Sequence, residues 1–136
     1  MEEVTDKKKI LIVDDEPKVR RLSHTILNKQ FDIIEAEDGR QALDMLIDQK
    51  PDVILMDMMM PKMDGLSACH KIKSDPATKS IPVIMVTAIG FELNIKLSQQ
   101  MGANGYVTKP FLPQELLDKI GEVLADPSAS ERPVLK

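Results

Sequence analysis

Short apolar runs alternate along the chain with longer segments in which apolar residues recur at helical spacing. The clearest runs cover 9–13, 52–56 and 82–86, and less regular ones cover 31–36 and 105–108. A short run that is apolar at successive positions, and therefore on both faces, is typical of a strand buried in a parallel sheet. The pattern predicts five such strands.

Helical patterns fill the intervals between these runs. Their apolar residues fall three, four, seven or eight positions apart, which places them along one face of a helix. Three such stripes are Val19, Leu22 and Ile26; Leu93, Leu97 and Met101; and Leu117, Ile120 and Leu124.

Local signals indicate where the helices begin and end. Pro17 is suited to the first turn of a helix, since its fixed φ is helical and its missing N–H has no partner there. Asp38, with Gln41 three residues later, resembles a capping box. Asp64 is the predicted N-cap of the third helix, which Pro76 and the two residues before it should end.

Strand and helix patterns alternate strictly, which predicts the α/β class with a parallel sheet covered by helices on both faces. We expect one domain over residues 7–125. A short polar tail should precede it at 1–6. Residues 126–136, rich in Pro and Ser, are predicted to be a C-terminal tail or the start of a linker to a further domain.

Composition limits the kinds of protein this can be. With 136 residues, 43% of them hydrophobic, the chain can bury a core of its own. A net charge of -4 argues against nucleic acid as a direct partner. The apolar runs are too short to span a bilayer, and residues 1–9 lack a secretory signal. Cys69, the single cysteine, is expected in the core, and we expect a cytoplasmic protein.

Polar residues stand where the predicted strands end. Ligands of open α/β sheets bind beyond the C-terminal ends of the strands. Asp14 and Asp15 stand at the end of the first strand, and Asp57, Thr87 and Lys109 end the third, fourth and fifth. We therefore expect three carboxylates, a hydroxyl and an ammonium to converge on one edge of the sheet.

Close-packed carboxylates repel one another unless a cation joins them. Mg²⁺ suits such a site, because it binds through one or two carboxylates, keeps several waters and takes phosphate oxygens as further ligands. An aspartate can also be the nucleophile that forms an acyl phosphate. In phosphoryl transfer the protein mainly positions groups and neutralises charge, which the metal and Lys109 could do while Thr87 donates a hydrogen bond.

Four segments carry these residues: LIVDDEP at 11–17, LMDMMMPKMDG at 55–65, VTA at 86–88 and GYVTKPF at 105–111. Together they resemble the receiver family of bacterial response regulators, over about residues 8–124. Each segment alone is a weak signal, but four in the right order, each at a strand end, are specific. The resemblance implies a flavodoxin-like, doubly wound (βα)5 fold with strand order 2-1-3-4-5.

The resemblance also implies roles for the acidic residues. Asp57 is the phosphoacceptor. Asp14 and Asp15 hold Mg²⁺ together with Asp57 and the backbone carbonyl of Met59. Lys109 pairs with the phosphoryl group, and the peptide bond that follows it, to Pro110, is cis.

A switch and its partners follow from the same resemblance. Thr87 moves toward the phosphoryl group, Tyr106 changes rotamer with it, and the surface of helix 4, strand 5 and helix 5 changes its binding. The donor is a sensor histidine kinase or a histidine phosphotransfer protein, and the output is an effector protein or a linked domain. A phosphorylation-dependent dimer is a further expectation. Neither His24, expected to be solvated, nor His70 looks like a phosphodonor. We expect no enzyme beyond catalysis of its own phosphorylation and dephosphorylation.

Three other functions fit the sequence less well. An aspartate-nucleophile phosphatase of the haloacid dehalogenase type needs an acid two residues after its nucleophile, where Asp57 is followed by Met59. A flavin binder of the flavodoxin type needs a Ser/Thr/Gly-rich phosphate loop after the first strand, where this chain has DDEP at 14–17. A pseudo-receiver that works without phosphorylation would not need the complete set of acids and lysine.

Overall fold

The computed structural model describes residues 7–58, 60, 63–88, 96–97 and 99–125. Within these ranges, strands and helices alternate as predicted. The elements are β1 (Lys9–Val13), α1 (Pro17–Leu27), β2 (Asp32–Ala36), α2 (Gly39–Gln49), β3 (Val53–Asp57), α3 (Gly65–Ser74), β4 (Val83–Ala88), β5 (Gly105–Lys109) and α5 (Pro113–Ala125).

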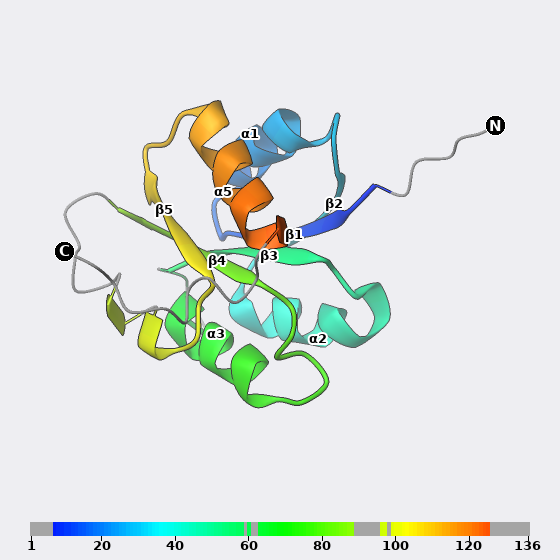
Figure 1. Cartoon of the computed structure of the whole chain (residues 1–136), viewed down its shortest axis with the longest axis vertical. Helices are drawn as coiled ribbons and strands as arrows, with labels where there is room; N and C mark the ends of the chain where they lie inside the picture. The colour runs from blue at the N-terminus through cyan, green and yellow to red at the C-terminus, as the bar shows by residue number, and fades with distance from the viewer. Residues whose placement is uncertain (1–6, 59, 61–62, 89–95, 98, 126–136) are drawn as a thin grey trace.

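The five strands form one parallel sheet in the order β2-β1-β3-β4-β5, which confirms the flavodoxin-like order. Helices α1 and α5 cover one face of the sheet, and α2 and α3 cover the other (Figure 1). Of the helix predicted between β4 and β5, residues 96–97 and 99–100 are helical. The rest of that helix, and the predicted tails 1–6 and 126–136, lie outside the described residues.

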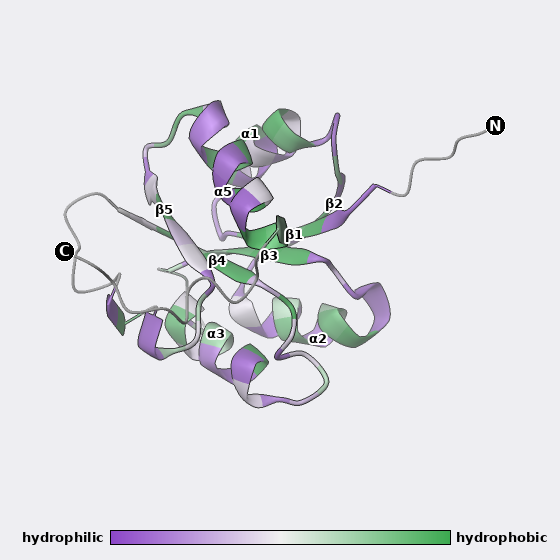
Figure 2. Cartoon of the chain, in the orientation of Figure 1, coloured by the Kyte–Doolittle hydropathy of each residue, from purple (hydrophilic) through white to green (hydrophobic). Residues whose placement is uncertain are grey.

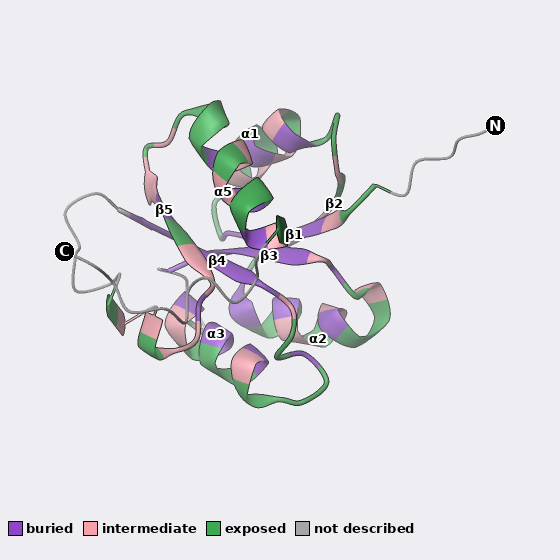
Figure 3. Cartoon of the chain, viewed as in Figure 1, coloured by how far each residue is buried: buried purple, intermediate pink, exposed green. Residues whose placement is uncertain are grey.

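The core consists of two apolar clusters, one on each face of the sheet. Alternate residues of a strand point to opposite faces, so Ile10 and Ile12 pack with α1 and α5, while Leu11 and Val13 pack with α2 and α3. The inner strands β1, β3 and β4 are therefore apolar and buried along most of their length, while the edge strands β2 and β5 are mostly half-buried (Figures 2 and 3). Each fully buried aliphatic side chain contributes roughly 1.5–3 kcal/mol, so the core fixes the sheet that positions the site.

Most of the predicted helix ends are confirmed. Helix α1 begins at Pro17, and Asp64 caps α3 by accepting a hydrogen bond from the backbone N–H of Ser67. The capping box at α2 is formed only in part. Asp38 accepts from the backbone N–H of Gln41 as expected, but the Gln41 side chain accepts from Glu37, one residue before the cap.

The predicted apolar stripe of α1 was wrong at Leu22, whose surface is 56% exposed. The buried residues of this helix are Ser23 and Leu27, with Val19 and Ile26 half-buried. Positions 19, 23, 26 and 27 form one helical face, and Leu22 lies beside it. The sequence pattern missed this face because Ser23 is polar; its small side chain can be covered where the helix meets the sheet.

The predicted end of the third strand is confirmed, since β3 ends at Asp57, and β4 continues one residue past Thr87, to Ala88. No helix among the described residues combines the length and apolar character needed to cross a membrane.

Candidate functional site

The acidic residues of the first and third strands meet at the C-terminal edge of the sheet. Asp14 follows β1 and Asp57 ends β3, and these strands are parallel neighbours. Both residues are buried, with 4% and 7% of their surface exposed, while Asp15 is exposed. One carboxylate oxygen from each of the three lies within 4.8 Å of the other two. The sheet therefore gathers acids that lie far apart in the sequence.

Lys109 bridges two of these acids. It ends β5, and its Nζ lies 3.2 Å from Asp14 Oδ2 and 3.2 Å from Asp57 Oδ1. The peptide bond between Lys109 and Pro110 is cis, as predicted. One ammonium thus serves two buried carboxylates, and the cluster retains an excess of negative charge.

Burial and the charges of the neighbouring groups both shift the pKa values of Asp57 and Lys109. Burial, followed by the charge of Asp14, raises the pKa of Asp57 from 3.8 to about 6, although Lys109 acts in the opposite direction. Burial disfavours the charge on Lys109, but Asp57 and Asp14 outweigh it, so the pKa of Lys109 is raised. At neutral pH Asp57 is therefore ionised, and among the described residues the cation that contacts it is Lys109, which it shares with Asp14.

The donor set fits a hard divalent cation. Its atoms are carboxylate oxygens close enough together to share one ion. Burial, and after it the charge of Asp14, raises the pKa of Asp57, and a cation bound there would favour the ionised carboxylate. Asp14 is also oriented before any ion binds, since its Oδ1 accepts a hydrogen bond from the backbone N–H of Glu16 at 2.9 Å. The backbone carbonyl predicted as a further ligand belongs to Met59, which lies outside the described residues.

Thr87 and Tyr106 stand on the strands beyond Asp57. Thr87 lies in β4 one residue past the register partner of Asp57, and only 3% of its surface is exposed. Its Oγ1 is buried and has no hydrogen-bond partner among the described residues, so the hydroxyl is available for a new acceptor. Tyr106 in β5 is 37% exposed, and Lys119 Nζ of α5 lies 6.0 Å from its ring centre.

The start of α3 is packed against the backbone of the site. The N–H of Gly65 donates to the carbonyl of Met58 at 2.9 Å. A Cβ atom at Gly65 would overlap the carbonyl oxygen of Asp57. Glycine at this position allows a helix to begin directly against the end of β3.

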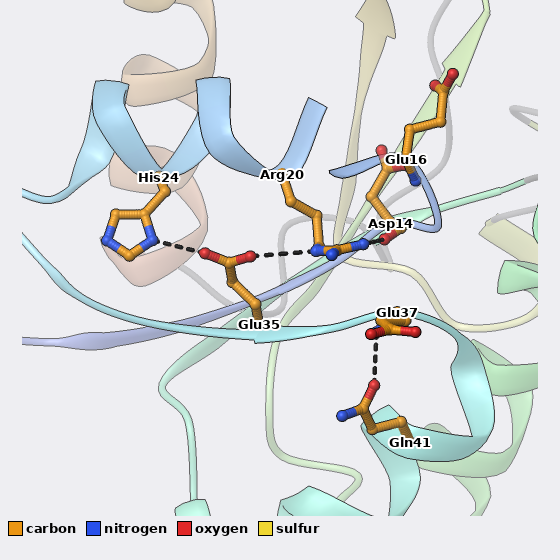
Figure 4. Close-up of polar contacts among 7 residues, drawn as sticks. All are labelled: Asp14, Glu16, Arg20, His24, Glu35, Glu37 and Gln41. Carbon is orange, nitrogen blue, oxygen red and sulfur yellow. Dashed lines mark hydrogen bonds and ion pairs between the residues drawn. The ribbon is translucent and has the colours of Figure 1, made fainter. Parts of the chain in front are cut away.

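Sequence reasoning missed a charged network beside the site. Glu35 of β2 contacts Arg20 and His24 of α1, and Arg20 also reaches Asp14 (Figure 4). His24, expected to be solvated, is 40% exposed and hydrogen-bonds Glu35. Two signals could have revealed the network: an acid within an otherwise apolar strand, and basic residues four positions apart on the facing helix.

Comparisons with known proteins agree with this architecture. A family model described as the response regulator receiver domain matches residues 10–121. The chain is 42% identical over 118 residues to the chemotaxis protein CheY of Halobacterium salinarum, covering 86% of this chain and 97% of that one. It also resembles the solved structure of the chemotaxis protein CheY4 of Vibrio cholerae, with a TM-score of 0.81, 30% identity, and coverage of 86% and 98%.

Other relatives are longer. The chain is 41% identical over 130 residues to the phosphate regulon transcriptional regulatory protein PhoB of Pseudomonas aeruginosa, covering 93% of this chain but 57% of that one. It spans about half the length of several curated relatives of this kind.

Proposed function

Because the chain belongs to the response regulator receiver domain family of two-component systems, we propose that it is a Mg²⁺-dependent phosphorylation switch whose phosphoacceptor is Asp57. The observation that carries this proposal is the bridge of Lys109 Nζ to Asp57 and Asp14 within the acidic cluster. The bridge supports the proposal because a carboxylate, an ammonium and further carboxylate oxygens lie together, as a phosphoacceptor site with a bound cation would require.

The chemistry follows from the ionisation of Asp57. A pKa of about 6 leaves this carboxylate ionised at neutral pH while making it more basic than an ordinary aspartate. A carboxylate oxygen attacks the phosphorus of a phosphohistidine, an O–P bond forms, and the P–N bond breaks to release the histidine. Lys109 stays beside the new phosphoryl oxygens and offsets their charge. Mg²⁺ held by Asp14, Asp15 and Asp57, with the backbone carbonyl of Met59 as a further ligand, supplies additional positive charge when bound.

Thr87 links the chemistry to a change of shape. Its buried hydroxyl has no partner among the described residues, so a phosphoryl oxygen at Asp57 offers it a strong acceptor. Movement of Thr87 biases the rotamer of Tyr106 and the surface formed by β5, α5 and the helix predicted between β4 and β5. The Tyr106 side chain, at 37% exposed, is accessible enough to change what that surface presents.

Receiver domains interact with histidine kinases and output effectors, and we propose both kinds of partner here. The donor is a sensor histidine kinase or a histidine phosphotransfer protein in the cytoplasm. The output is a separate effector, a linked domain or a phosphorylation-dependent dimer. We propose no direct contact of this domain with nucleic acid or with a membrane. The chain catalyses its own phosphorylation and dephosphorylation and turns over no other substrate.

Labelling with acetyl phosphate tests the phosphoacceptor. We expect Mg²⁺-dependent incorporation of one phosphoryl group, complete loss in Asp57→Asn, and normal labelling in Asp44→Asn, which changes an exposed aspartate of α2. Intact-protein mass spectrometry measures the product directly. Full labelling of Asp57→Asn would remove Asp57 as the acceptor, and undiminished labelling in EDTA would remove the metal.

A second variant tests the switch separately. Lys109→Ala should lose the phosphorylation-dependent change in partner binding, because the ammonium that contacts Asp57 is gone. A normal change of affinity on phosphorylation of this variant would show that Lys109 has no such role.

A further inference from the structure

Glu35 occupies an unusual place for a charged residue. It lies in β2 opposite Ile12 of β1, and two residues after Ile33, so it points to the sheet face that packs against α1 and α5. Its side chain is 34% exposed. A carboxylate placed beside an apolar core requires compensating partners.

Helix α1 supplies those partners from one face. Arg20 and His24 are four residues apart, and both reach Glu35: Arg20 Nε lies 3.1 Å from Oε1, and His24 Nδ1 lies 2.7 Å from Oε2 (Figure 4). The hydrogen bond from His24 comes first among the causes that hold the pKa of Glu35 below its usual 4.5. Burial opposes it, and the bond from Arg20 adds to it. Both carboxylate oxygens are therefore occupied, and α1 is tied to β2.

The guanidinium of Arg20 also contacts the acidic site, through Nη1. Arg20 Nη1 donates to the backbone carbonyl of Asp14 at 2.7 Å, and 14% of the Arg20 side chain is exposed. That carbonyl belongs to the planar peptide that joins Asp14 to Asp15. The orientation of this peptide sets the position of Asp15 relative to Asp14, and hence the distance between their two carboxylates.

The other polar groups of Asp14 already have partners. Its N–H donates to Ala36 at the end of β2, its Oδ1 accepts from Glu16, and its Oδ2 contacts Lys109. The carbonyl is the remaining group, and Arg20 is the partner that the structure gives it. A buried carbonyl without a partner would favour rotation of the peptide toward water.

We propose that Arg20, anchored by Glu35 and His24, is a positioning residue that orients the Asp14–Asp15 peptide and thereby sets the affinity of the acidic site for its cation. This inference rests on the proposed function, because it assumes that the acidic cluster binds Mg²⁺. In this arrangement Arg20 acts through the backbone carbonyl of Asp14.

The sign of the effect separates positioning from simple charge. Loss of a positive charge beside an acidic site should strengthen cation binding by electrostatics alone. Loss of a group that orients a ligand should weaken it, and outer partners of metal ligands typically account for roughly tenfold or more in affinity. For Arg20→Gln we expect the Mg²⁺ dissociation constant to rise by roughly tenfold.

Calorimetric titration with MgCl₂ on the metal-free, unphosphorylated chain tests this, with urea unfolding as a check that each variant is folded. Arg20→Lys, which keeps the charge but cannot reach Glu35 and Asp14 together through one ammonium, should show a smaller rise. Glu35→Gln should also show a smaller rise, because the guanidinium remains but loses its charged anchor. The control is Arg21→Gln, which removes the same charge from an exposed neighbouring position and should leave the affinity unchanged or slightly higher.

The double variant Arg20→Gln/Glu35→Gln should bind Mg²⁺ as Arg20→Gln does, since Glu35 acts through Arg20. An unchanged or lower dissociation constant in folded Arg20→Gln would overturn the inference. Should that variant fail to fold, an unchanged constant in Glu35→Gln would overturn it. If the wild-type chain itself shows no Mg²⁺ binding, the metal dependence in the proposed function fails instead.

Discussion

Glu35 and Asp57 are both carboxylates on a sheet with an apolar core, yet their ionisation is shifted in opposite directions. The pKa of Glu35 lies below its usual value, while that of Asp57 is raised to about 6. Glu35 has a hydrogen-bond partner on each oxygen, from Arg20 and His24. Asp57 shares the ammonium of Lys109 with Asp14, and Asp15 is a third acid in the same cluster.

The difference shows where the fold balances charge and where it does not. Around Glu35 the chain provides its own compensating groups, so the carboxylate acts as a structural tie between β2 and α1. Around Asp57 the described residues concentrate three acids about one lysine, at a cost in stability. Such an imbalance is characteristic of a site that is completed by a group from outside the chain.

The largest effect is expected from crowding the backbone of the Asp57 site. In Gly65→Ala the new Cβ would overlap the Asp57 carbonyl, so α3 or the end of β3 must move. We expect a loss of about 3 kcal/mol in the free energy of unfolding, at the upper end for overpacking. Gly121→Ala in α5 is the control, since a Cβ added there would have space around it, with nothing within 4 Å. This variant should gain roughly 0.5–1 kcal/mol in the free energy of unfolding. Urea unfolding measures both, and equal stabilities would contradict the close approach.

Neutralising the two carboxylates should change stability with opposite signs. In metal-free buffer at neutral pH, Asp57→Asn removes a charge that is buried and lies beside Asp14. Burial and then Asp14 raise the pKa of Asp57 from 3.8 to about 6, and one pKa unit corresponds to about 1.4 kcal/mol. We expect a gain of about 2 kcal/mol, since the contact with Lys109 is weakened as well. Glu35→Gln should lose about 1 kcal/mol, a value reduced by solvent screening because the side chain is 34% exposed. Destabilisation by both variants would mean that the Asp57 site is internally balanced.

The pH dependence should follow these signs. Between 3.8 and about 6, folded Asp57 keeps a proton that the unfolded chain has released, so its contribution to stability falls as the pH rises through this window. The gain in the free energy of unfolding of Asp57→Asn over the wild-type chain should therefore grow from about pH 4 to about pH 7 and vanish below that range. The contribution of Glu35, whose pKa is lowered, is present above its usual value of 4.5 and is lost as the pH falls below it. Urea titrations of the three proteins across this range measure both trends, and an Asp57→Asn advantage that is constant with pH would refute the assignment.

Mg²⁺ should reduce the imbalance at the Asp57 site. A ligand that binds only the folded chain stabilises it by about 1.4 kcal/mol at ten times its dissociation constant. We expect this gain for the wild-type chain and for the surface control Asp44→Asn, and a smaller one for Asp14→Asn, which lacks one of the clustered carboxylates. Thermal unfolding with MgCl₂, reversed by excess EDTA, provides the measurement. An equal gain in Asp14→Asn would place the stabilising ion elsewhere on the protein.

Local sequence patterns were sufficient for much of the fold. The bounds of β1 were predicted from its apolar run, and the starts of α1 and α3 from Pro17 and Asp64, because these signals act within a few residues. They were insufficient for α1's buried face, where Leu22 is exposed and Ser23 is buried. The rotation of a helix on a sheet depends on the neighbouring elements as well as on its own apolar residues.

What the sequence determined by itself is the alternation of elements and the identity of the polar residues at their ends, since both depend on short-range chemistry. The strand order came only from resemblance to a family, and the tertiary structure confirms it. The tertiary structure alone decided that Lys109 bridges Asp14 and Asp57, and that Arg20 joins Glu35 to the Asp14 backbone. Those contacts connect residues up to 95 positions apart, and such distances are set by the pairing of the strands and by the packing of helices on the sheet.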